Sequence, residues 1–501
     1  MQPGRILYYL LLLFLAACQV GAPTTGAPEA SATHPLTTST PADLAPTPTS
    51  PPTAAPTPVE PAKPADLPRP LYEMEVDVDY AAHTAAVKQQ VTYTNRTGEN
   101  LPELLIVVET MYYPGVFQLE SFTWTDGSPI QSYAWDGSWI RLTLPTPLQS
   151  GQSIQFVIVY KLNIPAPVQS PSTRPVPFGY SARQTNLVDW YPMVAPYQTG
   201  VGWLAHLPSY YGEHQVYESA DYVITLRVVG NSTGIVVAAS SPDLGDETVH
   251  RYQMDAARTF ALSFSPEYKV LTRKAGAVTI YSYFFSFHSA AGEKALQVTA
   301  ESVELFSRLF GSYDNLSLTV VEADFLDGME YDGLYFLSNG FYNLYQGTPG
   351  EYLVAIAAHE TAHQWWFGQV GNDQALEPWL DEALCTYSEL IYYENLFPEA
   401  VQWWWSYRVN YYAPTGAINI SIYNPDGSAT PYLTYKNSVY LNGAHFLDDL
   451  RKQIGDDIFF AFLNDYAEKM DSQVAGGQQF FDILSTHTSS DISDLINIYF
   501  K

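Results

Sequence analysis

Two histidines with a glutamate between them form the segment of this chain that has the clearest chemical meaning. The segment reads His359-Glu360-Thr361-Ala362-His363, and eighteen residues separate it from a second glutamate, Glu382. On a helix, residues four apart lie on the same face, so both imidazoles can reach one metal ion with Glu360 beside it. Two neutral imidazole nitrogens and one carboxylate are a ligand set of catalytic zinc, which leaves one coordination position for water. Glu360 can accept a proton from that water, so the spacing predicts one zinc ion per chain and a hydrolytic reaction.

The alternative interpretation is a helix whose two histidines only find hydrogen-bond partners. The residues on both sides of the motif are apolar on every face, which predicts a buried helix: Val354–Ala358 and Trp365–Phe367. Three ionisable groups in a buried helix need compensation, because an unpaired buried charge is costly. A metal ion supplies that compensation, so the surroundings favour zinc.

The N-terminus has the pattern of an export signal. Arg5 precedes an apolar run, Ile6 to Ala17, which is too short for a comfortable membrane span but has the length of a signal-peptide core. The run ends in Leu-Ala-Ala-Cys18, which resembles the bacterial lipobox, where the cysteine becomes the lipidated first residue of the mature protein. We therefore expect residues 1–17 to be a lipoprotein signal peptide, and Cys18 to carry a lipid anchor at the extracytoplasmic face of the bacterial cell envelope. An ordinary signal peptide with a chance cysteine is the alternative.

Composition excludes several other classes of protein. The chain has two cysteines. If the thiol of Cys18 is lipidated, Cys385 has no partner for an intrachain disulfide. We expect Cys385 to be a buried apolar residue. Residues 18–70 are rich in Pro, Thr and Ala with almost no aromatic residues, which predicts a disordered tether. The formal net charge of −29 disfavours binding to nucleic acid.

Residues 71–270 carry the pattern of a β domain. From Leu71 to Tyr80 apolar and acidic residues alternate, which is typical of a strand with one solvated face. Turn residues separate further strand-like runs, and antiparallel pairing is therefore expected. These runs are Leu104–Val108, Ile154–Tyr160 and Tyr222–Val229.

Residues 271–501 change to a mixed pattern. Apolar residues with helical spacing run from Leu296 to Phe310 and end at Gly311, and Leu316 to Val321 reads as a strand. The two helices that carry the motif and Glu382 come next. Further helices are expected at Leu441–Gln453 and Asp457–Met470, so an α+β domain follows the β domain.

Three motifs, in the same order along the chain as in the family, resemble those of the aminopeptidase N family of zinc metallopeptidases, the gluzincins that also include leukotriene hydrolase. The strongest is the zinc motif, extended by Gln364-Trp365-x-x-Gly368 and by Trp379-Leu-Asp-Glu382. Gly328-Met329-Glu330-Tyr331 falls where that family carries its exopeptidase motif, and Tyr440-Leu-Asn-Gly443 resembles the segment of its catalytic tyrosine. The resemblance implies an N-terminal saddle-type β domain followed by a thermolysin-like catalytic domain.

The resemblance also implies a role for each matching residue. His359, His363 and Glu382 would bind zinc, and Glu360 would activate the water. Tyr440 would donate a hydrogen bond to the oxyanion of the tetrahedral intermediate. Glu330, with Gly328 and Met329 beside it, would bind the free α-amine of the substrate and so direct cleavage to the first peptide bond.

The sequence departs from the family pattern at three points. Tyr331 stands where the family has Asn, and Asn442 stands where it has Lys, which bears on amine recognition more than on hydrolysis. The third is the lack of a large helical C-terminal domain after the catalytic one, from which we expect a more open cleft that admits longer peptides.

Three functions remain open from the sequence. The first is an exported zinc aminopeptidase that removes N-terminal residues from peptides. A zinc endopeptidase or another hydrolase on the same scaffold follows if Glu330 does not face the amine site. A surface binding protein without catalysis is the third, and the intact motif argues against it.

Overall fold

The computed structural model describes residues 67–166, 176–230, 233–246, 248–423 and 431–500. The predicted signal peptide, Cys18 and nearly all of the predicted tether lie outside these residues. Within them, no helix combines the length and the apolar character that a membrane span requires.

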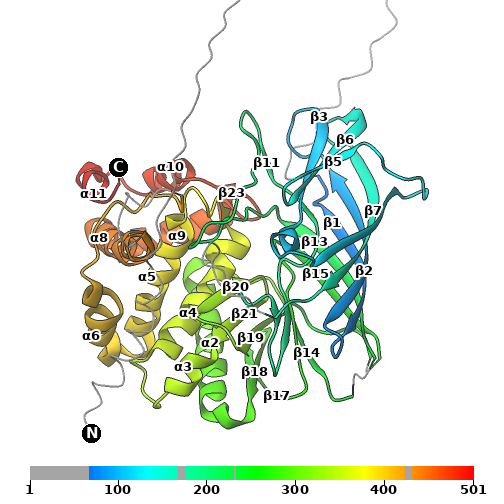
Figure 1. The fold of residues 1–501 in the computed structure, drawn as a ribbon. Coiled ribbons are helices and arrows are strands. Elements are labelled where there is room, and N and C mark those ends of the chain that lie inside the picture. The colour runs from blue at the N-terminus through cyan, green and yellow to red at the C-terminus, as the bar shows by residue number, and fades with distance from the viewer. Residues whose placement is uncertain (1–66, 167–175, 231–232, 247, 424–430, 501) are drawn as a thin grey trace, which may run out of the picture. The chain divides into compact units, whose positions relative to one another are not determined.

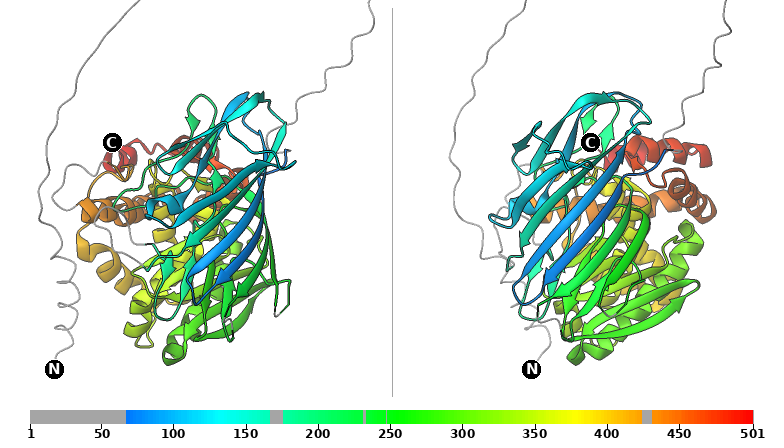
Figure 2. Two further views of the ribbon diagram at one scale, coloured as in Figure 1. Left: turned by 45° about the vertical axis from the view of Figure 1, so that its right-hand side comes forward. Right: turned by 90° about the vertical axis from the view of Figure 1, so that its right-hand side faces the viewer.

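The alternating pattern after Leu71 forms the central strand of a six-stranded sheet. In β1 (Leu71–Asp79) the apolar positions are buried and the acidic ones lie on the more exposed face, as predicted. This strand pairs antiparallel with β2 and parallel with β13, so the sheet is mostly but not wholly antiparallel. The order of strands is β15 (His250–Ala257), β13 (Ala220–Val229), β1, β2 (Thr84–Thr94), β7 (Ser153–Asn163) and β4 (Phe117–Trp124). Its long strands face the viewer in the right-hand view of Figure 2.

Smaller sheets complete the β half and enclose its apolar core. One has the order β10 (Met193–Val194), β3 (Leu101–Val107), β6 (Trp139–Leu148) and β5 (Tyr133–Asp136). Another has the order β14 (Val236–Ala239), β16 (Leu262–Ser265), β9 (Thr185–Leu187) and β8 (Gly179–Tyr180). A short hairpin joins β11 (Tyr197–Gln198) and β12 (Gly202–Trp203).

Residues 268–500 are called the catalytic half because they contain the zinc motif, and the described residues before them are the β half. A five-stranded sheet supports the helices of the catalytic half. Its order is β17 (Tyr268–Ala275), β18 (Val278–Phe285), β19 (Ser317–Ala323), β21 (Leu334–Ser338) and β20 (Gly328–Tyr331). One face of this sheet, with Ile280 and Leu318, shares a core with the helices, whereas the other face, with Val321 and Phe336, shares the core of the β half. The sheet therefore lies between the helices and the β half (Figure 1).

Helices cover the first of these faces. The apolar stripe that ends at Gly311 is α2 (Ser289–Phe310), and the predicted strand after it is β19. The zinc-motif helix α4 (Tyr352–His363) continues into a π-helical turn at Gln364–Gln369, and α5 (Trp379–Leu396) packs against it. The remaining helices are α3 (Asn339–Leu344), α6 (Val401–Trp403), α7 (Pro431–Tyr435), α8 (Gly443–Ile454), α9 (Asp456–Lys469), α10 (Gly477–His487) and α11 (Ser493–Tyr499).

Two further π-helical turns follow along the chain, Trp404–Val409 and Lys436–Asn442, and the latter precedes α8. The sequence predicted one helix from Leu441, but the regular helix begins at Gly443. A π-helical turn inserts one residue into the helical repeat and re-aims the side chains around it, and such turns are frequent at functional sites. Tyr440 lies in this turn.

Candidate active site

Helix α4 places both histidines and Glu360 in the interior of the catalytic half. The exposed fractions of His359, Glu360 and His363 are 4%, 4% and 1%, so the buried helix predicted from the sequence is confirmed. Helix α5 brings Glu382, 3% exposed, to the same place. One ligand atom from each of His359, His363 and Glu382 lies within 4.8 Å of the others.

The spacing of these atoms fits a tetrahedral zinc ion. His359 Nε2 lies 3.2 Å and His363 Nε2 lies 3.7 Å from Glu382 Oε2. Ligands bound at the usual zinc distances in tetrahedral geometry lie about 3.4 Å apart. Two nitrogens and one carboxylate oxygen are also a donor set that zinc accepts, so these residues fit the metal that the sequence predicted.

Each histidine is held through its other ring nitrogen. His363 Nδ1 lies 2.6 Å from Asp381 Oδ1, and His359 Nδ1 lies 3.0 Å from Glu389 Oε1. Arg408 Nη2 donates to Glu389 Oε1 at 2.7 Å and Trp404 Nε1 to Oε2 at 2.8 Å, so that carboxylate is fixed in turn. Such contacts orient an imidazole toward a metal and raise its basicity.

Glu360 lies beside His363 and Glu330 in this cluster. Its Oε2 is buried and has no hydrogen-bond partner among the described residues. Gly328 on the edge strand β20 lies directly against it, because a Cβ at position 328 would lie 2.0 Å from Glu360 Oε1. The absence of a side chain at 328 thus makes room for the carboxylate that the sequence predicted as general base.

Glu330 lies on the same strand as Gly328 and reaches the same site. It is 3% exposed, and one of its oxygens lies within 4.8 Å of ligand atoms of Glu360 and His363. Gln374 Nε2 donates to Glu330 Oε1 at 3.3 Å and to Asp381 Oδ2 at 2.7 Å, which links the two carboxylates. Met329, the other residue predicted here, is 6% exposed and packs in the core of the β half.

Tyr440 reaches the cluster from the π-helical turn. Its hydroxyl donates to Glu382 Oε1, and its ring lies parallel to that of His359, with 6.1 Å between the ring centroids. The structure therefore brings together the site residues predicted from the sequence, except Met329, whose side chain packs in the core of the β half. The individual roles of these residues stay predictions.

The electrostatics of the site separate its carboxyl groups. Burial raises the pKa of Glu360 to about 8, with further increases from Glu330 and Glu382, although the two imidazoles oppose the shift. The pKa of Glu382 falls to about 2, because hydrogen bonds from His359 and Tyr440 and the charge of both imidazoles outweigh the opposing effect of burial. Glu382 is thus a fixed anion suited to hold a cation, whereas Glu360 can exchange a proton near neutral pH.

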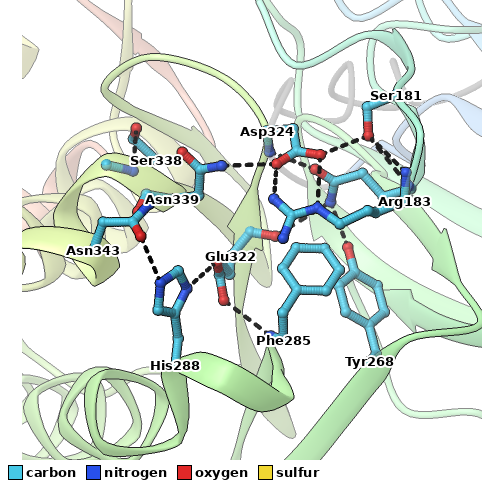
Figure 3. A network of polar contacts seen from close by, with 12 residues as sticks. Ser181, Arg183, Tyr268, Phe285, His288, Glu322, Asp324, Ser338, Asn339 and Asn343 are labelled. Carbon is cyan, nitrogen blue, oxygen red and sulfur yellow. Dashed lines mark hydrogen bonds and ion pairs between the residues drawn. The ribbon is translucent and has the colours of Figure 1, made fainter.

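A polar network fixes the loop that leads into β20 (Figure 3). Asp324, at the start of this loop, accepts hydrogen bonds from Ser181 and Arg183 of the β half and from Asn339. Beside it, the buried carboxylate of Glu322 accepts from the backbone N–H of Phe285 at 2.9 Å and contacts His288 at 2.7 Å. The β half therefore helps to determine where the strand with Glu330 begins.

Arg258 ties the β half to the end of the zinc-motif helix. This guanidinium is 2% exposed and donates to the carbonyls of Phe367 at 2.7 Å and Gly368 at 3.0 Å, just after the motif. It also donates to the carbonyls of Tyr217 and Gln473, both at 2.8 Å, and of Gln369 at 3.2 Å. Five backbone carbonyls from three segments thus converge on one side chain.

Comparison with known proteins agrees with this geometry. Residues 294–499 match the model of the peptidase family M1 domain, whereas no curated protein matches the sequence. The matched range includes the zinc motif, Glu382, Glu330 and Tyr440. This half of the chain is a peptidase family M1 domain, and the family resemblance predicted from the sequence is confirmed.

Solved structures show the same two-part fold. A mutant M1 zinc metallopeptidase from Deinococcus radiodurans superposes with a TM-score of 0.60 at 16% identity, covering 87% of this chain and 94% of that one. A mutant from the same organism bound to Tyr-Ser-Ala gives a TM-score of 0.62 at 17% identity, covering 86% and 93%. The predicted order of domains, a β domain before an α+β catalytic domain, is confirmed. The chain thus contains a peptidase family M1 domain over residues 294–499, and zinc, the cofactor predicted from the sequence, is the metal of that family.

Proposed function

We propose that this metallopeptidase is an aminopeptidase that releases the first residue of a peptide. The observation that carries the proposal is the position of Glu330, a buried carboxylate next to Glu360 and His363 that neither the metal ligand set nor the general base requires. A carboxylate at that place can pair with a protonated α-amine and so fix the first peptide bond over the metal. Gln374 holds one oxygen of Glu330, which leaves the other for the substrate.

Different residues of the site would bind the metal, transfer the proton and stabilise the oxyanion. His359, His363 and Glu382 would hold zinc, which when bound supplies Lewis acidity toward water and the scissile carbonyl. Glu360 would accept a proton from the attacking water and pass it to the leaving amine. Tyr440 would turn its hydroxyl from Glu382 to the oxyanion that develops on the peptide carbon.

The decisive experiment compares free and blocked N-termini. Alanyl-p-nitroanilide and N-acetylalanyl-p-nitroanilide are the matched substrates, assayed with wild-type protein and with Glu330→Gln. We expect kcat/KM for the free substrate to exceed that for the acetylated one by about 100-fold or more, since a buried charge pair is lost on acetylation. Glu330→Gln should lower kcat/KM for the free substrate by a larger factor than it lowers kcat/KM for the acetylated substrate.

An endopeptidase on the same scaffold is the second candidate, motivated by Tyr331 in place of the family's Asn. Tyr331 is 1% exposed, and its ring packs against Phe336 with 6.0 Å between centroids, so the substitution adds to the core beneath β20. Equal hydrolysis of acetylated and free substrates, unchanged in Glu330→Gln, would establish this alternative in place of the aminopeptidase.

We also propose that the enzyme acts on peptides outside the cytoplasm from a lipid anchor at Cys18. The lipobox-like sequence supports this location, and a solved relative bound to Tyr-Ser-Ala supports peptide substrates. Fractionation of cells that express wild-type protein or Cys18→Ser provides the test: the wild-type protein should remain with the membrane and the variant should not.

A further inference from the structure

A cavity of about 180 Å³ lies away from the residues of the candidate active site. It opens between the loop that follows β14 and the face of the catalytic sheet that meets the β half. Its walls come from four strands and this loop, so its shape depends on the contact between the two halves. The residues that line it are Val237, Ala239, Ser241, Pro242, Asp243, Tyr252, Tyr281, Tyr283 and Thr319.

Ser241 gives this cavity a polar group without a partner. Its side chain is 8% exposed, and its Oγ has no hydrogen-bond partner within the described part of the chain. Thr319, the other hydroxyl residue of the wall, is by contrast satisfied, because its Oγ1 donates to the carbonyl of Ala239 at 3.2 Å. Leaving a buried hydroxyl unpaired is costly, so a molecule that binds Ser241 is favoured here.

Three tyrosines supply most of the aromatic surface. Tyr281 and Tyr283 lie two positions apart on β18 and so share the face of the sheet that is turned away from the helices. Their ring centroids are 6.5 Å apart. Tyr252 is 3% exposed and enters from β15. The face of an aromatic ring attracts a cation within about 6 Å of its centroid.

Asp243, an exposed residue in the wall of the cavity, supplies the only carboxylate among the lining residues. Its Oδ1 accepts from the backbone N–H groups of Gly245 at 2.8 Å and Arg251 at 3.0 Å, and its Oδ2 lies 2.6 Å from His250 Nδ1. Burial raises the pKa of Asp243, but these hydrogen bonds outweigh it and the net pKa lies below the ordinary value. No lysine or arginine is among the lining residues, and the one histidine nearby, His250, lies behind the Asp243 carboxylate, so the wall favours a cation over an anion.

We propose that this cavity binds a small organic cation, a protonated or quaternary amine with a short aliphatic body. Asp243 acts as its counter-ion, the rings of Tyr281 and Tyr283 cover the charged group, and Ser241 Oγ bonds its polar substituent. The volume is smaller than that of cavities that hold drug-sized ligands, which limits the cation to a few heavy atoms. This site is independent of the proposed peptidase reaction, since none of its residues belongs to the zinc cluster.

The proposal is tested by titrating the zinc-loaded protein with choline chloride and measuring choline binding by saturation-transfer NMR. Sodium chloride at equal ionic strength and glucose, a neutral molecule, are the reference solutes. We expect saturable binding of choline in the millimolar range and no saturable binding of glucose. Asp243→Asn should weaken choline binding about tenfold or more, and Tyr283→Leu should weaken it as well.

A control variant shows whether the effect depends on the position of the removed charge. Asp255→Asn removes the same charge from an exposed position of β15 that does not line the cavity, and it should leave the affinity for choline unchanged. Absence of saturable choline binding to wild-type protein would overturn the proposal. Equal binding by glucose, or the same affinity in Asp243→Asn as in Asp255→Asn, would overturn it too.

Discussion

Gly328 and Glu360 lie so close together that a side chain at position 328 has no room beside the carboxylate at 360. A Cβ built on Gly328 would lie 2.0 Å from Glu360 Oε1 and 2.5 Å from its Cδ. The edge strand β20 and the helix α4 thus approach each other where the candidate general base lies. The Gly-Met-Glu motif therefore has two functions at this site, since Gly328 admits the base and Glu330 supplies a second carboxylate.

Replacement of this glycine should impair catalysis more than folding. In Gly328→Ala the new methyl group would displace the end of the flexible Glu360 side chain, so we expect kcat to fall by about 10- to 100-fold. The midpoint of thermal unfolding should change little, because the clash is relieved by one side-chain rotation. Steady-state kinetics and a thermal melt measure both effects. Gly340→Ala is the control, because a Cβ at position 340 would lie 3.2 Å from Ser338 Oγ and does not approach Glu360. Full activity in Gly328→Ala would show that the position of Glu360 is not critical.

Removal of the base itself should separate metal binding from turnover. Glu360→Gln keeps the shape of the side chain but cannot accept a proton, so kcat should fall by about 100- to 10,000-fold. The zinc content should remain near one ion per chain, because His359, His363 and Glu382 are unchanged. Metal analysis beside the activity assay gives the answer, and loss of zinc from this variant would assign Glu360 a role in binding the ion.

The carboxylates behind the histidines should control zinc affinity. Glu389→Gln and Asp381→Asn each remove a charged partner of an imidazole Nδ1, and we expect zinc to bind about 10- to 100-fold more weakly. Competition with a chromogenic chelator measures this affinity without any substrate. Glu394→Gln, on the same helix but paired with Arg451, should bind zinc as tightly as the wild type.

The sequence predicts the part of the site that depends on spacing along one helix. His359, Glu360 and His363 share a helical face, so their meeting follows from the chain itself. Glu389 lies seven residues, or about two turns, after Glu382 and could have been found by the same reasoning. Arg408 and Gln374 carry no such signal, because each reaches the cluster from a separate segment whose path depends on tertiary packing.

In the fold, too, local sequence patterns predict individual elements but not how distant elements pair. The period-two pattern of Leu71–Asp79 predicts β1, but it does not predict that β13, far along the chain, pairs with β1 in parallel. Helix α2 and its end at Gly311 also follow from the sequence pattern. The π-helical turn that carries Tyr440 could not be predicted, because its residues have the same local preferences as those of an ordinary helix.

One half-buried carboxyl group, that of Asp189, should make the stability of the β half depend on pH. Burial, with a further contribution from Glu109, raises the pKa of Asp189 to about 7, against an ordinary value of about 4 in the unfolded chain. Since the folded state prefers the protonated form, this stabilisation is complete below about pH 4 and is lost as the pH rises to about 7.

Asp189→Asn tests this dependence without changing the backbone. Asp189 has a positive φ of 46°, which Asn also adopts, and Asn can still accept the hydrogen bond from the Tyr217 hydroxyl. We expect urea unfolding at pH 5 and pH 7.5 to show a smaller loss of stability in the variant than in the wild type. Asp255→Asn, an exposed position, should behave as the wild type does, and an unchanged pH dependence in Asp189→Asn would contradict the assignment.

We expect Arg258 to contribute more than other side chains to the contact between the β half and the catalytic half. Its guanidinium donates to five carbonyls, three of them in the turn that follows His363. Arg258→Lys keeps the charge but has too few donors, in the wrong geometry, to satisfy these acceptors, so buried carbonyls lose their partners. We expect the free energy of unfolding to fall by about 3 kcal/mol. Arg227→Lys, at an exposed ion pair with Asp77, should change it by less than about 1 kcal/mol.

Limited proteolysis then distinguishes a joint between the halves from a contact that stabilises only one of them. If Arg258 holds the halves together, Arg258→Lys should expose cleavage sites between the β half and α2 at temperatures where the wild type is resistant, and zinc should be released in the same range. Because four of the five carbonyls belong to the catalytic half, cleavage confined to the β half with zinc fully retained would contradict this role.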